Sequence, residues 1–164
     1  MGVTYDKIIS KGETMQSRVL KLGLVLLVAV ILTGCGREKP KTADEWVDKG
    51  FYAFGKKNYN EAIKCYTKAL KLNPNDPYTY YLRGMMYEGK GNLDKVFYSF
   101  AISDYEQAIK IKPNFAQAYY NRGVVYYYQK NYAKAWENVR KAQALGYEPV
   151  PSFLNYLRKA SGHK

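Results

Sequence analysis

Few side chains in this chain could act as nucleophiles, metal ligands or acid–base catalysts. Its 164 residues include two cysteines, Cys35 and Cys65, and one histidine, His163, at the penultimate position. Because this histidine is single and lies so close to the end of the chain, we expect neither a His-based catalytic triad nor a histidine metal cluster. The sequence has no Gly-rich phosphate loop, Cys-x-x-Cys pair or His-Glu-x-x-His helix, and its carboxylates are scattered. We therefore expect no enzymatic activity, no cofactor and no metal.

The residues before Cys35 form a pattern that is found at protein export signals. Residues 22–32 form an uninterrupted run of apolar residues and glycine, which is too short to span a bilayer core that needs about 20 residues. Arg18 and Lys21 precede the run, and Thr33 and Gly34 close it. A positive segment, a short apolar core and small residues at its end are typical of a secretory signal peptide.

The end of this run, Leu32-Thr33-Gly34-Cys35, resembles the lipobox of bacterial lipoprotein precursors. The resemblance implies a type II signal peptide over residues 1–34 and a diacylglyceryl group, carrying chains such as palmitate, on Cys35. Two or more acyl chains anchor a protein durably. Gly36 replaces the aspartate that commonly retains enteric lipoproteins in the inner membrane. The resemblance thus favours the outer membrane, facing the periplasm, or the outer face of the cytoplasmic membrane in an organism without one. The alternative is a cysteine that merely ends a signal peptide.

Residues 1–14 fit a secretion signal poorly because Asp6 and Glu13 are acidic. Met15 begins a better positively charged segment, so we expect translation to start there. Residues 35–42 are expected to form a polar tether after the lipidated cysteine. With Cys35 modified, Cys65 has no disulfide partner, and we interpret it as a small packing residue.

Beyond the tether, three segments share one frame, with a repeat period of about 34 residues. Gly50 and Gly84 lie one period apart, and Gly123 follows Gly84 slightly later than one period. An alanine follows each glycine, and in two copies a proline comes at the same distance after the alanine; these residues are Ala62, Ala101, Ala135, Pro74 and Pro113. Such a period with a helical pattern predicts stacked helix pairs. We expect the first pair at about 44–56 and 60–72, and a helix capped by Asp76 before Pro77.

These residues resemble the tetratricopeptide repeat, whose signature is W-x2-L-G-x2-Y, then A-x3-F, A and P. The first copy matches at Trp46, Gly50, Ala62, Tyr66, Ala69 and Pro74. The leucine of the signature is replaced by Lys49, Arg83 or Arg122. The resemblance implies an all-α solenoid of three helix-turn-helix repeats over 43–76, 77–115 and 116–149. A capping helix and tail follow over 150–164, with Phe153, Leu154 and Leu157 at helical spacing.

The second copy contains five extra residues, Val96 to Phe100. One interpretation is a second helix that is extended at its N-terminus, with the aromatic side chains packed on neighbouring helices. The other is an exposed aromatic protrusion that contacts a partner or a second copy through Phe97, Tyr98 and Phe100.

The family resemblance implies that the first helices of successive pairs line a peptide-binding groove. The apolar stripe on these helices comprises Val47, Phe51, Phe54, Tyr78, Tyr81, Met85, Tyr120, Val124 and Tyr127, with Asn121 beside it. Spacings of three and four keep each set on one helix face, which suits an extended or helical peptide. Alternatively, the capping helix or the tether covers part of the stripe. Repeat domains that clamp chaperone C-terminal carboxylates use basic and amide side chains where this chain has Val47, Phe51 and Leu82, so we expect no such clamp.

The net charge of +12 is spread along the chain, and no compact arginine-rich run or nucleic-acid signature accompanies it. Solvated helix faces or an anionic site would both explain this charge, and we expect no nucleic acid partner. The leading hypothesis is a lipid-anchored adaptor that binds a protein or peptide in the cell envelope. The alternatives are a pilotin-like assembly factor for a secretin and a self-assembling scaffold. The partner, the organism and the oligomeric state are left open.

Overall fold

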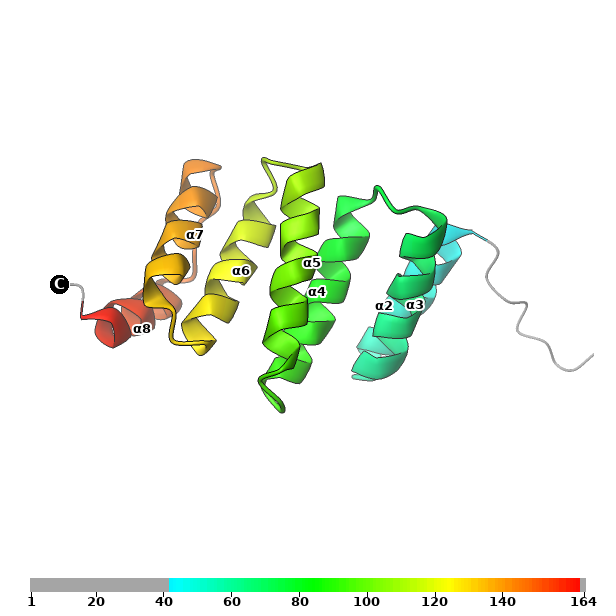
Figure 1. Ribbon diagram of the computed structural model, residues 1–164, viewed down its shortest axis with the longest axis horizontal. Coiled ribbons are helices and arrows are strands. Elements are labelled where there is room, and N and C mark those ends of the chain that lie inside the picture. The colour runs from blue at the N-terminus through cyan, green and yellow to red at the C-terminus, as the bar shows by residue number, and fades with distance from the viewer. Residues whose placement is uncertain (1–41, 163–164) are drawn as a thin grey trace, which may run out of the picture. The chain divides into compact units, whose positions relative to one another are not determined.

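The computed structural model describes residues 42–162, and the helix labels in this part begin at α2 (Figure 1). The regular elements of the described residues are all α-helices, which confirms the predicted all-α class. They are α2 (Ala43–Gly55), α3 (Tyr59–Leu72), α4 (Pro77–Gly91), α5 (Phe97–Ile111), α6 (Ala116–Tyr128), α7 (Tyr132–Ala144) and α8 (Pro151–Ser161).

The helices stack side by side in chain order, as Figure 1 shows. The most extensive contacts are within the pairs α2–α3, α4–α5 and α6–α7. Contacts of α3 with α4 and of α5 with α6 join the pairs, and α8 packs on α7. The first helices of the pairs are therefore α2, α4 and α6, and α4 also touches α6 directly.

Side-chain caps fix where several helices begin. Thr42 and Glu45 form a capping box at the start of α2, with reciprocal hydrogen bonds of 3.2 and 3.0 Å between side chains and backbone N–H groups. The predicted cap at α4 is confirmed. The Asp76 carboxylate accepts hydrogen bonds from the backbone N–H groups of Tyr78 and Thr79, and Pro77 is at the first helical position.

Glycine permits the close approach of the two helices in a pair. A Cβ atom added at Gly50 would lie 2.5 Å from the ring of Tyr66, and one at Gly84 would lie 2.7 Å from the ring of Tyr105. Both tyrosines are fully buried. The repeated glycines are therefore needed for packing, because any larger side chain would displace a buried ring.

Two of the three cations that replace the signature leucine, Arg83 and Arg122, connect neighbouring second helices. The Arg83 guanidinium binds both carboxylate oxygens of Asp104 on α5, at 2.7 and 2.8 Å, and donates to Thr67 Oγ1 on α3 at 3.1 Å. In the next pair, Arg122 donates to Asn138 Oδ1 on α7 at 2.8 Å and forms an ion pair with Glu106 on α5. Each arginine on a first helix thus bridges the second helices on either side of it.

The five extra residues lengthen both helices of the second pair. Helices α4 and α5 each have 15 residues, whereas α3 has 14 and α2, α6 and α7 have 13. The connection of α4 to α5 consequently extends beyond the neighbouring turns at the lower edge of Figure 1. Tyr98 at the start of α5 is only 4% exposed, and its ring stacks on Tyr128 with centroids 5.8 Å apart.

The predictions for the signal peptide, the lipidated Cys35 and most of the tether concern residues outside the described part of the chain. Among the described helices, none combines the length and the apolar character needed to cross a bilayer. Cys65 is buried and has a free thiol. The described structure agrees with its interpretation as a packing residue.

Candidate functional site

On α2, the predicted stripe is largely open to solvent. Phe51 and Phe54 are 47% and 40% exposed. The Phe51 ring meets the buried Tyr66 ring edge-on, with centroids 6.2 Å apart. Val47 is half-buried and packs against the core cluster that contains Tyr66 and Met86. Phe51 therefore rests on a buried ring, and both phenylalanines present a face to solvent.

On α4, Tyr81 and Met85 are half-buried and continue this surface. Met85 packs against the core clusters of both the first and the second helix pair, so it links them. The Tyr81 ring lies 5.9 Å from that of Tyr105 and 4.9 Å from that of Phe115, and its hydroxyl accepts a hydrogen bond from Asn121 Nδ2 on α6 at 3.2 Å. Asn121, predicted as the polar member of the site, thus orients Tyr81.

Tyr78, the remaining α4 residue of the predicted stripe, is 53% exposed. Its ring packs edge-on against Phe115, with centroids 5.1 Å apart, and Lys112 lies over the ring. It therefore sits at the start of α4, beside the connection between α5 and α6.

On α6, the capping segment covers part of the predicted stripe. The Phe153 ring of α8 meets the rings of Tyr120 and Tyr127 edge-on, with centroids 5.6 and 5.5 Å apart. Tyr147, in the preceding connection, lies 4.7 Å from the Tyr120 ring, and Tyr120 is only 8% exposed. Val124 is half-buried. The capping helix therefore covers the α6 part of the stripe, as one of the two predicted alternatives had it. The open part of the stripe lies on α2 and α4.

Glu88 also lies within the stripe on α4, although it is not among the residues predicted for the site. The spacing 81, 85, 88 repeats the spacing 47, 51, 54 one period later, so Glu88 is level with Phe54. Its carboxylate accepts a hydrogen bond from Tyr105 Oη at 2.6 Å, and the ion pairs among the described residues do not include it. Burial raises the pKa of Glu88 from its ordinary value of 4.5 to about 7, and the hydrogen bond from Tyr105 opposes this rise.

The aromatic side chains of the insert have two different environments. Tyr98 is buried, whereas Phe97 is half-buried and Phe100 is 50% exposed. The rings of Phe97 and Phe100 pack against Tyr87 of α4, with centroids 6.3 and 5.4 Å away. The rings of Phe97 and Tyr98 are therefore packed, whereas Val96, Ser99 and one face of Phe100 are open to solvent.

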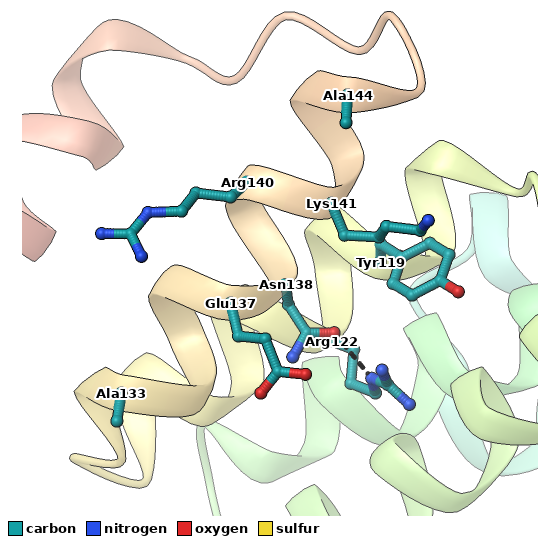
Figure 2. A pocket seen from close by; sticks show the side chains of 8 residues that line it. All are labelled: Tyr119, Arg122, Ala133, Glu137, Asn138, Arg140, Lys141 and Ala144. Atoms are coloured by element: carbon teal, nitrogen blue, oxygen red, sulfur yellow. Dashed lines mark hydrogen bonds between the residues drawn. The ribbon is translucent and has the colours of Figure 1, made fainter.

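A pocket of about 630 Å³ lies on α6 and α7 (Figure 2). Figure 2 shows the hydrogen bond from Arg122 to Asn138 within it and the Arg140 side chain pointing away from the other labelled groups. Its lining side chains are Tyr119, Arg122, Ala133, Glu137, Asn138, Arg140, Lys141 and Ala144. They include no histidine, cysteine or hydroxyl nucleophile beside a base, and the described residues contain no cluster able to hold a metal ion.

Two family descriptions match this chain. The one described as TPR repeat matches residues 54–91 and 98–130, and the one described as tetratricopeptide repeat matches residues 116–145. Hsp70-Hsp90 organizing protein 1 from Arabidopsis thaliana is 46% identical over 52 residues, which are 32% of this chain and only 9% of that protein.

Two solved structures are similar over most of the described part. The first TPR of Spaghetti (RPAP3) bound to the HSP90 peptide SRMEEVD has a TM-score of 0.64 and 25% identity, over 76% of this chain and 94% of that one. The TPR2B domain of yeast Sti1, in a complex with an Hsp70 peptide, has a TM-score of 0.63 and 28% identity, over 74% of this chain and 98% of that one.

Proposed function

This chain belongs to the tetratricopeptide-repeat family, and we propose that it is an adaptor that binds an apolar segment of another protein in the bacterial cell envelope. The observation that carries the proposal is the exposure of Phe51 and Phe54 beside half-buried Val47 and Met85. Aromatic side chains supported on a packed base lose little entropy on binding and are frequent in protein contacts.

The ligand is proposed to be selected by apolar side chains. Repeat domains that clamp C-terminal carboxylates have basic or amide groups at the positions of Val47, Phe51 and Leu82. A peptide that ends like SRMEEVD therefore finds no ionic partners at these positions of this chain. Because Phe153 lies on the α6 part of the stripe, the ligand is placed over α2 and α4. A short helix or an extended strand with two or three apolar anchors fits this surface.

Lipidation of Cys35 is proposed to confine this binding to a membrane surface, in keeping with the Leu32-Thr33-Gly34-Cys35 motif. Confinement raises the effective concentration of both partners without any additional contact. Labelling of cells with radioactive palmitate is expected to mark the wild-type chain and the Cys65→Ala variant, but not Cys35→Ser. Label retained in Cys35→Ser would contradict the anchor, and the adaptor proposal would still stand.

A photoreactive phenylalanine analogue at Phe51 tests the binding surface. In intact cells it is expected to crosslink to an envelope protein through one defined apolar segment. The matched control is the same analogue at Tyr52, the next residue on α2, which is 55% exposed but about 100° around the helix. A peptide of the captured segment is then expected to bind Phe51→Ser about 30-fold more weakly than wild type, as for an interface hot spot. Equal crosslinking from both positions, or unchanged affinity, would contradict the proposal.

The identity of the captured protein also separates the narrower functions. A secretin subunit would indicate a pilotin-like assembly factor, whereas a second copy of this chain would indicate a self-assembling scaffold. A soluble or membrane protein of another class would indicate a general envelope adaptor.

A further inference from the structure

Most of the lysines in the connections between helices lie at one edge of the helix stack. The connections 56–58, 92–96 and 129–131 follow α2, α4 and α6, and they lie together at the lower edge of Figure 1. We name these three connections the lysine edge. They contain four lysines and one carboxylate, Asp94. The connections of the opposite edge, 73–76, 112–115 and 145–150, contain one lysine and two carboxylates. The charge at the lysine edge is thus not a general property of the connections.

Three of these lysines have no partner of opposite charge within the described part of the chain. The ion pairs found there do not include Lys57, Lys95 or Lys130. Lys57 and Lys130 also have positive φ angles, 57° and 62°, which a lysine rarely adopts and glycine adopts without cost. The fold therefore gains nothing from a side chain at these two turns, and their charge remains available for an external ligand.

An apolar tip projects from the middle of the lysine edge. Leu93 is 85% exposed and Val96 is 54% exposed, both in the connection lengthened by the five extra residues. The backbone there is held by hydrogen bonds from the N–H groups of Leu93 and Asp94 to the carbonyl of Lys90, and from that of Val96 to the Asp94 carboxylate. The tip is therefore already ordered, and burying it in an apolar phase requires little further loss of entropy.

A pocket of about 520 Å³ lies beside this tip, between two of the connections. Lys95 contributes to it from one connection and Lys130 from the other, and the stacked rings of Tyr98 and Tyr128 form part of its wall. Its lining residues are Lys95, Tyr98, Tyr128, Gln129, Lys130 and Asn131. Two cationic groups and two amides at one opening suit a phosphate group, and the neighbouring apolar tip suits acyl chains.

We propose that the lysine edge docks on an anionic phospholipid surface, with a headgroup phosphate in the pocket between Lys95 and Lys130 and with Leu93 at the acyl boundary. Lysines close to an anionic membrane each strengthen binding about fivefold, and an inserted apolar side chain adds to this. The proposal depends on neither the adaptor function nor the lipid on Cys35. It assigns to the repeat domain a membrane contact of its own, which would orient the helix stack relative to the bilayer.

The test uses the full chain carrying Cys35→Ser and an environment-sensitive fluorophore on a single new cysteine, Leu93→Cys. Cys65 is buried and burial raises the pKa of its thiol, so it does not compete for the label. The matched control carries Asn75→Cys, an exposed position in the opposite edge. Vesicles with 30% phosphatidylglycerol, chosen as roughly the charge of an anionic leaflet, are expected to shift the emission of the label at position 93 to the blue, but not that at position 75. Vesicles of phosphatidylcholine alone are expected to shift neither.

Lys57→Gly with Lys130→Gly removes two charges without harming the fold, because both positions favour glycine. This double variant is expected to unfold at the same or a higher temperature and to bind the anionic vesicles about 30-fold more weakly. Lys71→Gln with Lys110→Gln, exposed lysines in the last turns of α3 and α5, removes the same charge and is expected to change the affinity less than threefold. Equal losses in both double variants, or no shift at position 93, would overturn the proposal. Competition by inorganic phosphate at constant ionic strength would assign the pocket to a free anion, and a shift caused by self-association without vesicles would assign the tip to a second copy.

Discussion

Replacing Asp104 with alanine is expected to lower the free energy of unfolding by about 3–5 kcal/mol, the usual cost of breaking a buried ion pair. The side chain of Asp104 is 6% exposed and that of Arg83 is 18% exposed, and the two form a bidentate pair. Without the carboxylate, the guanidinium would stay buried with only Thr67 Oγ1 as an acceptor. Urea unfolding of the full chain, followed by circular dichroism, measures the loss.

Two further variants separate the ion pair from the packing around it. Asp104→Asn retains an acceptor and reproduces the arrangement of Arg122 with Asn138, so it is expected to cost less than half as much as the alanine variant. Replacing both partners with apolar residues, Arg83→Met with Asp104→Leu, is expected to be close to neutral because no charge remains buried. Two outcomes would contradict this account: Asp104→Ala as stable as wild type, or the double variant as the least stable of the three variants. Either would show that the ion pair does not compensate the burial of the Arg83 charge.

Most of the fold could be predicted from residues that act within one repeat. Gly50 and Gly84 mark positions where a buried tyrosine ring leaves no room for a Cβ atom, and Asp76 with Pro77 fixes a helix start through local hydrogen bonds. The replacement of the signature leucine by arginine was visible as well. Its consequence was not, because the partner Asp104 lies 21 residues away on another helix and becomes identifiable only when the pairs are stacked.

The candidate site was harder to predict because its exposure depends on how elements that are distant in the sequence meet. The spacing of Phe153, Leu154 and Leu157 predicted a capping helix, but not that the Phe153 ring would lie on Tyr120 and Tyr127. That contact requires α8 to pack at the position that the first helix of a fourth repeat would take after α7. Periodicity shows which side chains share a helix face, whereas the burial of that face depends on the neighbouring helix.

Glu88 could have been found by applying the repeat period to the stripe itself. The equivalents of Val47, Phe51 and Phe54 on α4 are Tyr81, Met85 and Glu88, one turn later than a stripe that begins at Tyr78. The same comparison explains a buried hydroxyl without a partner among the described residues. Tyr105 donates to Glu88, whereas Tyr66, its equivalent on α3, faces a repeat in which Phe54 offers no acceptor. One acidic side chain therefore distinguishes the second repeat both in polarity and in hydrogen bonding.

The stability of the chain is expected to fall between pH 5 and pH 8 because of Glu88. Burial raises its pKa in the folded state to about 7, whereas in the unfolded chain it titrates near 4.5. Below pH 4.5 the carboxyl is neutral in both the folded and the unfolded state, so its ionisation does not change the free energy of unfolding. As the pH rises through this window, the unfolded chain loses the proton first, which favours unfolding until the folded form also ionises near pH 7. The shift corresponds to about 3 kcal/mol.

Glu88→Gln isolates this contribution, because the amide can still accept the hydrogen bond from Tyr105 but cannot ionise. The free energies of unfolding measured in urea at pH 5 and pH 8 are expected to differ by about 2–3 kcal/mol more in wild type than in Glu88→Gln. Tyr105→Phe removes the hydrogen bond that stabilises the carboxylate, so the wild-type decline is expected to extend to higher pH in that variant. Parallel pH profiles of wild type and Glu88→Gln would show that Glu88 titrates normally.

The raised pKa of Glu88 also affects ligand binding, because an apolar ligand that covers Glu88 favours its neutral form. Binding over α4 is therefore expected to weaken as the pH rises past 7 in wild type. In Glu88→Gln, binding is expected to be independent of pH.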